Sequence, residues 1–316
     1  MNRSIKAFAA GVLLATTFAS FAQQKLSIGT GGTGGVYYPL GGAMANILTS
    51  KLPGIQATAE VTGASVDNLK FIRAGKMDIG MTMADSAWDA YQGTGKFKDT
   101  KADVRTLFVM HANDLQVVTV EGSGISKLSD LKGKRISTGA PGSGTEIMAL
   151  RLLEAVGIDK DVRRERLSVA ESVNAMKDRK IDAFIWSGGV PTAAITDLAA
   201  TPGIKVKLID HADAVDALNA KYGPLYTKGT IPANSYQGQD KPSANAVVWN
   251  LLVADAKMSD DLAYRLVKTL LENQPELVKV HKEATTIALK NQGSASPIPY
   301  HPGARKYLQE KGIKVQ

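Results

Sequence analysis

Two glycine-rich segments are the residues of this sequence best suited to hold a ligand. Residues 29–35 read GTGGTGG and residues 139–146 read GAPGSGTE. Each follows a strand-like run and precedes a run with helical periodicity, so backbone N–H groups and a helix N-terminus would converge there on an anion. In the second segment, the hydroxyls of Ser143 and Thr145 would add donors. One such segment is equally consistent with a tight turn, but two at equivalent places favour binding.

Enzymes that bind nucleotides through such loops are the first alternative. The spacing Gly29-x-Gly31-x-x-Gly34 fits the dinucleotide fingerprint, but Glu60, the acid that ends the next strand, lies farther along the chain than usual. The second segment has no lysine after its glycines, so it is not a P-loop. An exported nucleotide- or phosphate-binding enzyme therefore stays open as the weaker alternative.

Other catalytic chemistry has less support. Ser143 lacks the first glycine of a hydrolase nucleophile elbow, and the four histidines show no metal-ligand spacing. The chain has no cysteine, which excludes thiol nucleophiles and thiolate metal sites. We therefore expect a protein that is not an enzyme and needs no cofactor or metal.

Further candidate binding residues follow the strands that are expected to be buried. Asp85 comes just after the apolar run 77–83, and Trp186 ends the corresponding run 181–186, with Ser187 directly after it. Open α/β sheets bind ligands at the carboxyl ends of their strands. Tyr37 could add a wall to the site, although an aromatic residue here is equally consistent with core packing.

The N-terminus predicts export. Arg3 and Lys6 precede an apolar run, residues 7–21, and small residues come just before a cleavage site near Ala22. An uncleaved anchor is the alternative, but the run is too short and too weakly apolar to span a membrane. We expect a periplasmic protein that begins near Gln23.

The charge balance argues against nucleic acid as a partner. The net charge of +8 falls to +6 without Arg3 and Lys6, and the basic residues are scattered among acids, apart from a dense group at residues 163–166. Nucleic-acid proteins concentrate basic residues and interleave aromatics, which are only 6% here. The positive balance is typical of mild attraction for anions.

Strand-like and helix-like segments alternate as in α/β proteins with mostly parallel sheets. We expect strands at 26–29, 56–61, 77–83, 135–138 and 181–186, and helices at 38–49, 65–74, 145–156 and 172–179, with Ser65 capping the second helix. The spacing of Lys76 and Asp78 recurs 104 residues later at Lys180 and Asp182. The recurrence predicts two similar βαβαβ units, one in each of two lobes.

Two crossings would join the lobes. Residues 104–110 and 115–120 are β-rich on either side of Asn113 and Asp114, and residues 246–254 form a long apolar strand for the return. Ser259 should cap a following helix. We therefore expect lobe 1 to comprise residues 23–115 and 245–316, and lobe 2 to comprise residues 116–244.

The chain closely resembles the TAXI family of TRAP-transporter solute receptors, beginning with Val36-Tyr37-Tyr38-Pro39 after the first glycine segment. The resemblance continues through residues 63–69, 131–135, 139–145, 301–304 and 310–313. It implies a type II periplasmic-binding-protein fold, two lobes that close on a small carboxylate such as glutamate or 2-oxoglutarate, and delivery to a TRAP permease. One departure is Ala84, where relatives often carry a polar residue.

The resemblance and the motifs together define the expected site of this α/β protein, which we expect to be a monomer. A sensory or surface binding protein on the same scaffold remains an alternative. The expected ligand contacts are Thr30, Gly31, Thr33, Gly34, Gly35, Tyr37, Ser65, Asp85, Ser143, Gly144, Thr145, Trp186 and Ser187.

Overall fold

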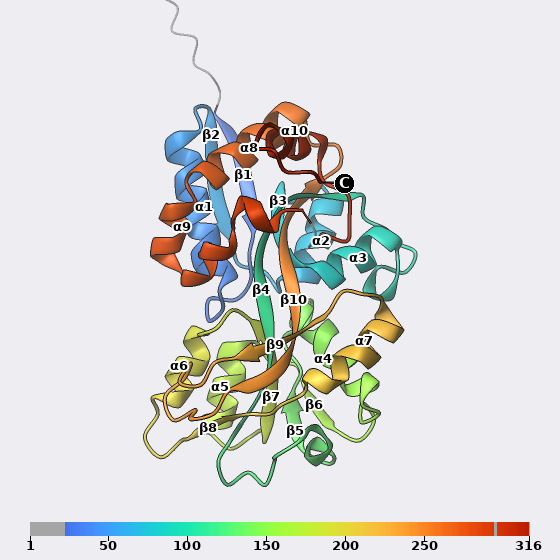
Figure 1. The fold of residues 1–316 in the computed structure, drawn as a ribbon, viewed down its shortest axis with the longest axis vertical. Helices are drawn as coiled ribbons and strands as arrows, with labels where there is room; N and C mark the ends of the chain where they lie inside the picture. The colour runs from blue at the N-terminus through green and yellow to red at the C-terminus, as the bar shows by residue number, and fades with distance from the viewer. Residues whose placement is uncertain (1–22, 294–295, 316) are drawn as a thin grey trace, which may run out of the picture.

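The computed structural model describes residues 23–293 and 296–315, which form two lobes stacked along the long axis (Figure 1). The expected signal, residues 1–22, lies outside the described residues. The first and the last described elements lie in the same lobe, called lobe 1 here. The two-lobed α/β fold expected from the sequence is confirmed.

Lobe 1 carries a mixed sheet in the order β2-β1-β3-β10-β4. Its own strands are β1 (Gln24–Gly29), β2 (Ile55–Glu60) and β3 (Ile79–Met83). Its α-helices are α1 (Tyr37–Lys51), α2 (Ser65–Arg73), α3 (Ala84–Gln92), α8 (Asp260–Glu272), α9 (Gln274–Val280) and α10 (Pro302–Glu310). Its short 3-10 helices are η1 (Gly95–Phe97), η4 (Lys282–Thr286) and η5 (Leu289–Asn291).

Lobe 2 continues the hydrogen-bonded path from β4 through β7 and β5 to β6. Its strands are β5 (Arg135–Ser137), β6 (Arg163–Glu165), β7 (Ala183–Gly188), β8 (Val206–Leu208) and β9 (Thr227–Ile231). Its helices are η2 (Leu128–Leu131), α4 (Gly144–Ala155), α5 (Val169–Lys177), α6 (Ala193–Ala199), η3 (Ala212–Ala214) and α7 (Val215–Tyr222).

Two long antiparallel strands, β4 (Val104–Val120) and β10 (Ser243–Asp255), run through both lobes (Figure 1). Residues 104–110 and 115–120, expected as two β-rich segments on either side of residues 113 and 114, form one continuous strand. Asn113 pairs with Val248 and Asp114 with Val247, so the ladder continues through the polar pair. The proposed lobe boundaries fall inside these strands, and their exact positions stay a prediction.

The predicted repeat is confirmed by strand order and by hydrogen bonding. Strands β2, β1 and β3 are parallel neighbours in lobe 1, as β6, β5 and β7 are in lobe 2. Asp78 accepts the backbone N–H of Ser27 on β1 at 2.7 Å, and Asp182 accepts that of Arg135 on β5 at 2.8 Å. The recurring aspartates therefore hold equivalent strands in the two units.

Two predicted helix starts need correction. Ser65 is the first residue of α2 and not its cap, because Ala64 occupies the cap position with φ 85° and the Ser65 hydroxyl accepts the N–H of Met83. Helix α5 begins at Val169 and not at Ser172, because Ser168 and Glu171 form a capping box there.

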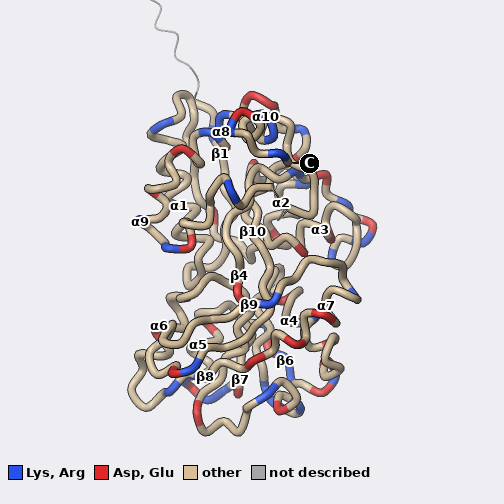
Figure 2. Tube along the Cα trace, in the orientation of Figure 1, with Lys and Arg blue, Asp and Glu red and all other residues tan. Residues whose placement is uncertain are grey.

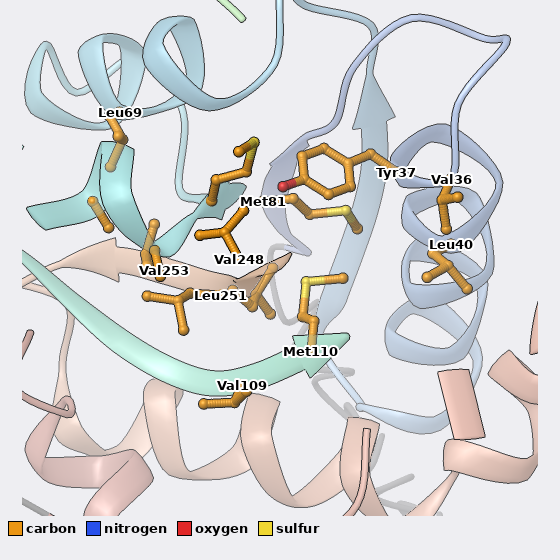
Figure 3. Packing of buried hydrophobic residues seen from close by; sticks show 14 of the residues in the cluster. Val36, Tyr37, Leu40, Leu69, Met81, Val109, Met110, Val248, Leu251 and Val253 are labelled. Atoms are coloured by element: carbon orange, nitrogen blue, oxygen red, sulfur yellow. The ribbon is translucent and has the colours of Figure 1, made fainter. Parts of the chain in front are cut away.

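Apolar side chains fill the space between the sheet and its helices. Figure 3 shows Val36, Tyr37 and Leu40 from the start of α1 beside strand residues such as Met81 and Met110. Lys and Arg alternate with Asp and Glu over both lobes in Figure 2, without a stripe of one sign. No helix among residues 23–293 and 296–315 is long and apolar enough to cross a membrane.

Candidate ligand-binding site

A cavity of about 240 Å³ lies between the lobes and takes its walls from both. At about 30 Å³ per water molecule, it holds roughly eight water volumes. Lobe 1 supplies residues 31–37, 61–65 and 83. The other lining residues, from lobe 2 and β4, are Asn113, Ala140, Ser143, Gly144, Thr145, Ser168, Val169, Ala170, Trp186, Ser187 and Gly188.

The structure brings together nearly all of the residues expected from the sequence. Two residues, Thr30 and Asp85, are outside the lining. The other expected residues of both glycine segments line the same cavity, so the two segments face each other across the lobes. Contact of any of these residues with a ligand stays a prediction. The expected residues found in the lining are Gly31, Thr33, Gly34, Gly35, Tyr37, Ser65, Ser143, Gly144, Thr145, Trp186 and Ser187.

Four helices begin at the cavity: α1, α2, α4 and α5. Their N-termini give the space a positive potential, since the first N–H groups of a helix have no partner within it. Helix α1 has no side-chain cap at Val36, whereas Ser143 caps α4 and Ser168 caps α5. Because Pro39, the third residue of α1, has no N–H, α1 offers no more free backbone donors than α4 and α5 keep after their caps.

The glycine segments are also where the lobes touch. The carbonyl of Gly142 in lobe 2 accepts the N–H groups of Val66 and Asp67, at 3.0 and 3.1 Å, from the start of α2 in lobe 1. A Cβ on Gly142 would overlap the Asp67 carboxylate, and one on Gly144 would come within 2.6 Å of the Ser65 hydroxyl. Side chains at these two positions would hold the lobes apart, so the glycines permit the lobes to approach this closely.

The first glycine segment makes the reciprocal contact. A Cβ on Gly35 would lie 3.1 Å from the Trp186 ring, and one on Gly34 would lie 3.3 Å from Val169. Trp186 is held in place because its indole N–H donates to Thr192 at 2.9 Å. The close approach leaves little room for a side chain at Gly34 and Gly35, whereas a Cβ on Gly32 would meet no atom within 4 Å.

The hydroxyls that were expected to donate to a ligand already have protein partners. Ser143 Oγ donates to the carbonyl of Ala140 at 2.7 Å and accepts the N–H of Glu146 at 3.0 Å. Thr145 Oγ1 makes only long contacts with the backbone of Ser187, at 3.3 and 3.5 Å. Ser143 therefore shapes the second loop, while Thr145 is the more available donor.

Thr30 does not reach the cavity, contrary to expectation. It is fully buried, and its hydroxyl donates to the carbonyl of Glu60 at 2.7 Å. Its carbonyl accepts from Asn68 Nδ2 at 2.8 Å and from Thr62 Oγ1 at 3.0 Å. Thr30 therefore fixes the start of the first loop to Glu60, Thr62 and Asn68, and the residues that line the cavity begin at Gly31.

Asp85 is also in a different place from the one expected. Helix α3 starts immediately after β3, and it turns Asp85 away from the cavity toward lobe 2. There Tyr226 donates to its carboxylate at 2.9 Å, and Arg151 of α4 lies 3.5 Å away. Burial raises the pKa of Asp85, against the opposing effects of Arg151 and Tyr226. Arg151 also makes a two-bond pair with Asp89 at 2.6 and 2.8 Å.

Tyr37 is anchored through buried polar side chains. Its hydroxyl donates to Asn250 Oδ1 on β10, and Asn250 Nδ2 donates to the carbonyl of His111 at 2.9 Å. Burial lowers the pKa of His111 to about 3, so the imidazole is neutral at ordinary pH. Because Tyr37 is bound to the strand that crosses between the lobes, its ring forms a fixed wall of the cavity.

Several lining residues were missed from the sequence. Residues 168–170 enter through the start of α5, and the capping-box pattern of Ser168 and Glu171 was the signal for it. Residues 61–64 enter through the turn before α2. Asn113 enters because β4 runs unbroken past the cavity, and no local sequence pattern indicates this.

Among the residues that the structure describes, the lining contains no Asp, Glu, Lys, Arg or His. Three acids near the cavity contact other residues. Asp85 faces Arg151, and Glu146 pairs with Arg166 at 2.6 Å. Asp67 packs against Gly63 and Gly142. Within the described residues, no group of three His, Cys, Asp or Glu is placed to hold a metal ion. The site can therefore bind through backbone dipoles, neutral donors and apolar walls.

Comparison with known proteins agrees with this architecture. The model of the NMT1-like family matches residues 28–312. The chain belongs to the NMT1-like family. Among solved structures, this NMT1-like protein is similar to a Bordetella bronchiseptica RB50 protein, with 19% identity over 90% of this chain and 88% of that one and a TM-score of 0.53.

Two further structures show the same fold. An L-cystine ABC transporter protein from Listeria monocytogenes matches with 17% identity, 85% and 99% coverage of this chain and that one, and a TM-score of 0.52. A Xanthomonas citri protein bound to chloride ion matches with 14% identity, 90% and 95% coverage, and a TM-score of 0.50. At such identities the likeness shows the fold.

Proposed function

We propose that this protein is a periplasmic solute receptor that closes its two lobes around a small carboxylate. The observation that carries the proposal is the cavity between the lobes, where both glycine segments and the N-termini of four helices meet. A charged acceptor gains about 1.5–3 kcal/mol from each well-placed hydrogen bond, so three or four backbone donors suffice for micromolar binding.

The cavity volume separates this function from the nucleotide-binding alternative. A space of about 240 Å³ is below the range of roughly 300–1,000 Å³ in which larger ligands bind, and it suits a small acid. No lysine or arginine lines it to hold a chain of phosphates. A receptor for a small anion fits this volume and lining better than an enzyme that uses a nucleotide.

Calorimetry tests the proposal. The protein is unfolded, freed of bound solute and refolded, and then titrated with glutamate, 2-oxoglutarate, succinate, pyruvate, their close relatives and inorganic phosphate. We expect at least one carboxylate to bind with micromolar or better affinity and to raise the melting temperature. Binding of phosphate alone, or no heat and no thermal shift with any acid, would contradict the carboxylate assignment.

We also propose a TRAP-type permease as the membrane partner, with the protein exported and cleaved near Ala22. The TAXI-like motifs support this partner, whereas the Listeria relative is described as an ABC transporter protein. The two classes differ in energy source. Uptake of the ligand by cells should stop when the sodium gradient is dissipated, and uptake that persists without the gradient but stops on ATP depletion would favour the ABC class.

A further inference from the structure

The electrostatic character of the cavity restricts its ligand more narrowly than its size does. Every lining side chain in the described structure is neutral, and the acids around the cavity are turned toward other groups. Four helix N-termini point their partial positive charge at the space. A negative ligand is therefore favoured, and a positive group inside the cavity would meet like partial charge.

We propose that the cavity selects carboxylates that carry no ammonium group, such as 2-oxo or 2-hydroxy acids, over the α-amino acids with the same carbon skeleton. An ammonium group needs a nearby carboxylate when it is removed from water, since an unpaired buried charge is costly. The cavity offers only hydroxyls and amides, and several of these are already engaged, including those of Thr62 and Ser143.

Asp85 is the residue that could have made this an amino-acid site. Its position after β3 places an acid close to the ligand-binding edge of the sheet, but the carboxylate is fully buried and bonded to Tyr226 beside Arg151. Asp67 packs against Gly63 and Gly142 and is not in the lining. Asp85 cannot pair with an ammonium group without losing its contacts with Tyr226 and Arg151 of the other lobe.

The apolar part of the lining supports the same conclusion. Val36, Val61, Met83 and Val169 supply aliphatic surface, and Tyr37 and Trp186 supply rings. A ligand with one charged end and a neutral remainder suits this division, because its carboxylate can face the helix N-termini while the remainder contacts the aliphatic walls.

Matched sets of acids test the inference, which rests on the proposed receptor function. The ligand-free protein is titrated with glutamate, 2-oxoglutarate and 2-hydroxyglutarate, and with the corresponding sets built on aspartate, alanine and leucine. We expect the best oxo or hydroxy acid to bind about a hundredfold more tightly than its amino acid, and any preference of tenfold or more supports the inference.

Failure of this inference and failure of the carboxylate assignment give different results in these titrations. If an amino acid binds as well as its oxo and hydroxy counterparts, or within tenfold of them, the inference is overturned while the receptor function stands. If no acid of any set binds, the carboxylate assignment itself fails and the inference fails with it.

A pair of variants tests the physical cause. Thr33 lines the cavity and is exposed, so Thr33→Asp adds a negative charge without disturbing the core, and Thr33→Asn is the neutral control of nearly the same shape. Compared with Thr33→Asn, Thr33→Asp should lower the preference for the oxo acid over the amino acid by tenfold or more. The same preference in both variants would show that lining charge is not what discriminates.

Discussion

Helix α4 joins the lobes in two places, and the two contacts have opposite chemistry. At its N-terminus, Gly144 and Thr145 line a neutral cavity. Two turns later, Arg151 is bound to Asp89 and lies beside Asp85, and these three charged side chains are at most 11% exposed. The half-buried Tyr222 ring packs against the guanidinium of Arg151. In the first contact, polar groups are left for a solute, whereas in the second the charges satisfy one another.

In the receptor proposed above, this difference would separate ligand binding from closure of the lobes. The neutral lining would leave an anionic ligand to backbone and hydroxyl donors. The ionic cluster on α3 and α4 can attract the lobes to each other without competing for the ligand. Asp85 and Asp89 lie four residues apart, so one face of α3 presents both acids to one arginine.

The largest effect should come from breaking the ionic contact. Arg151→Met keeps most of the side-chain length but leaves Asp85 and Asp89 buried without their cation. Removing one partner of a buried ion pair costs about 3–5 kcal/mol, so we expect a loss of that order in the free energy of unfolding. Urea denaturation near neutral pH measures it.

The matched control is an exposed pair of the same lobe. Lys228 and Asp216 are 2.7 Å apart, with side chains 53% and 79% exposed. Lys228→Ala should change stability by less than about 1 kcal/mol. Equal effects of the two substitutions would mean that the cluster on α4 is no stronger than a surface pair.

The second prediction concerns closure at the glycine segment. Gly142 has φ 79°, and its missing Cβ leaves room for Asp67 of the other lobe. Gly142→Ala should cost about 1–2 kcal/mol in backbone strain and, because the new methyl group holds the lobes apart, weaken ligand binding by roughly tenfold or more. Calorimetry gives the affinity and small-angle scattering the separation of the lobes.

A substitution at Gly122 separates the effect of backbone strain from the effect of holding the lobes apart. Its φ of 81° is nearly the same, but a Cβ there meets no atom within 4 Å. Gly122→Ala should therefore carry the backbone cost with unchanged affinity and unchanged dimensions. If both variants bind the ligand equally well, Gly142 is only a turn residue.

The sequence was informative where a local pattern determines structure. Glycine segments between strand and helix, the repeated aspartates at 78 and 182 and the cap at Ser259 all predict features of the structure correctly. Thr30 and Asp85 were correctly placed near the ends of their strands, but their side chains do not point into the cavity. The direction of a side chain depends on its tertiary neighbours, which the local sequence does not show. Only the docking of α4 against α3 determines that Asp85 faces Arg151.

The arginine-rich group at residues 163–166 shows the same limit. Two of its members, Arg164 and Arg166, pair with Glu146, which is only 2% exposed and lies in the first turn of α4. From the sequence, these residues are only a patch of positive charge. Their partner lies about twenty residues earlier in the chain, and only the parallel placement of β6 beside β5 brings it into contact.

The smallest expected effect concerns the Ser143 hydroxyl, which either stabilises the second loop or donates a hydrogen bond to the ligand. Ser143→Ala removes the cap of α4, and Ser259→Ala removes the equivalent cap of α8 far from the cavity, so each should cost about 1 kcal/mol of stability. Because the Ser143 hydroxyl already donates to Ala140, we expect ligand affinity to fall less than about fivefold in the first variant. A hydrogen bond to a carboxylate contributes about 1.5–3 kcal/mol, so a loss well above tenfold would mean that the hydroxyl turns to the ligand on binding. Calorimetry on both variants therefore decides whether the second segment binds the ligand through its backbone or through a side chain.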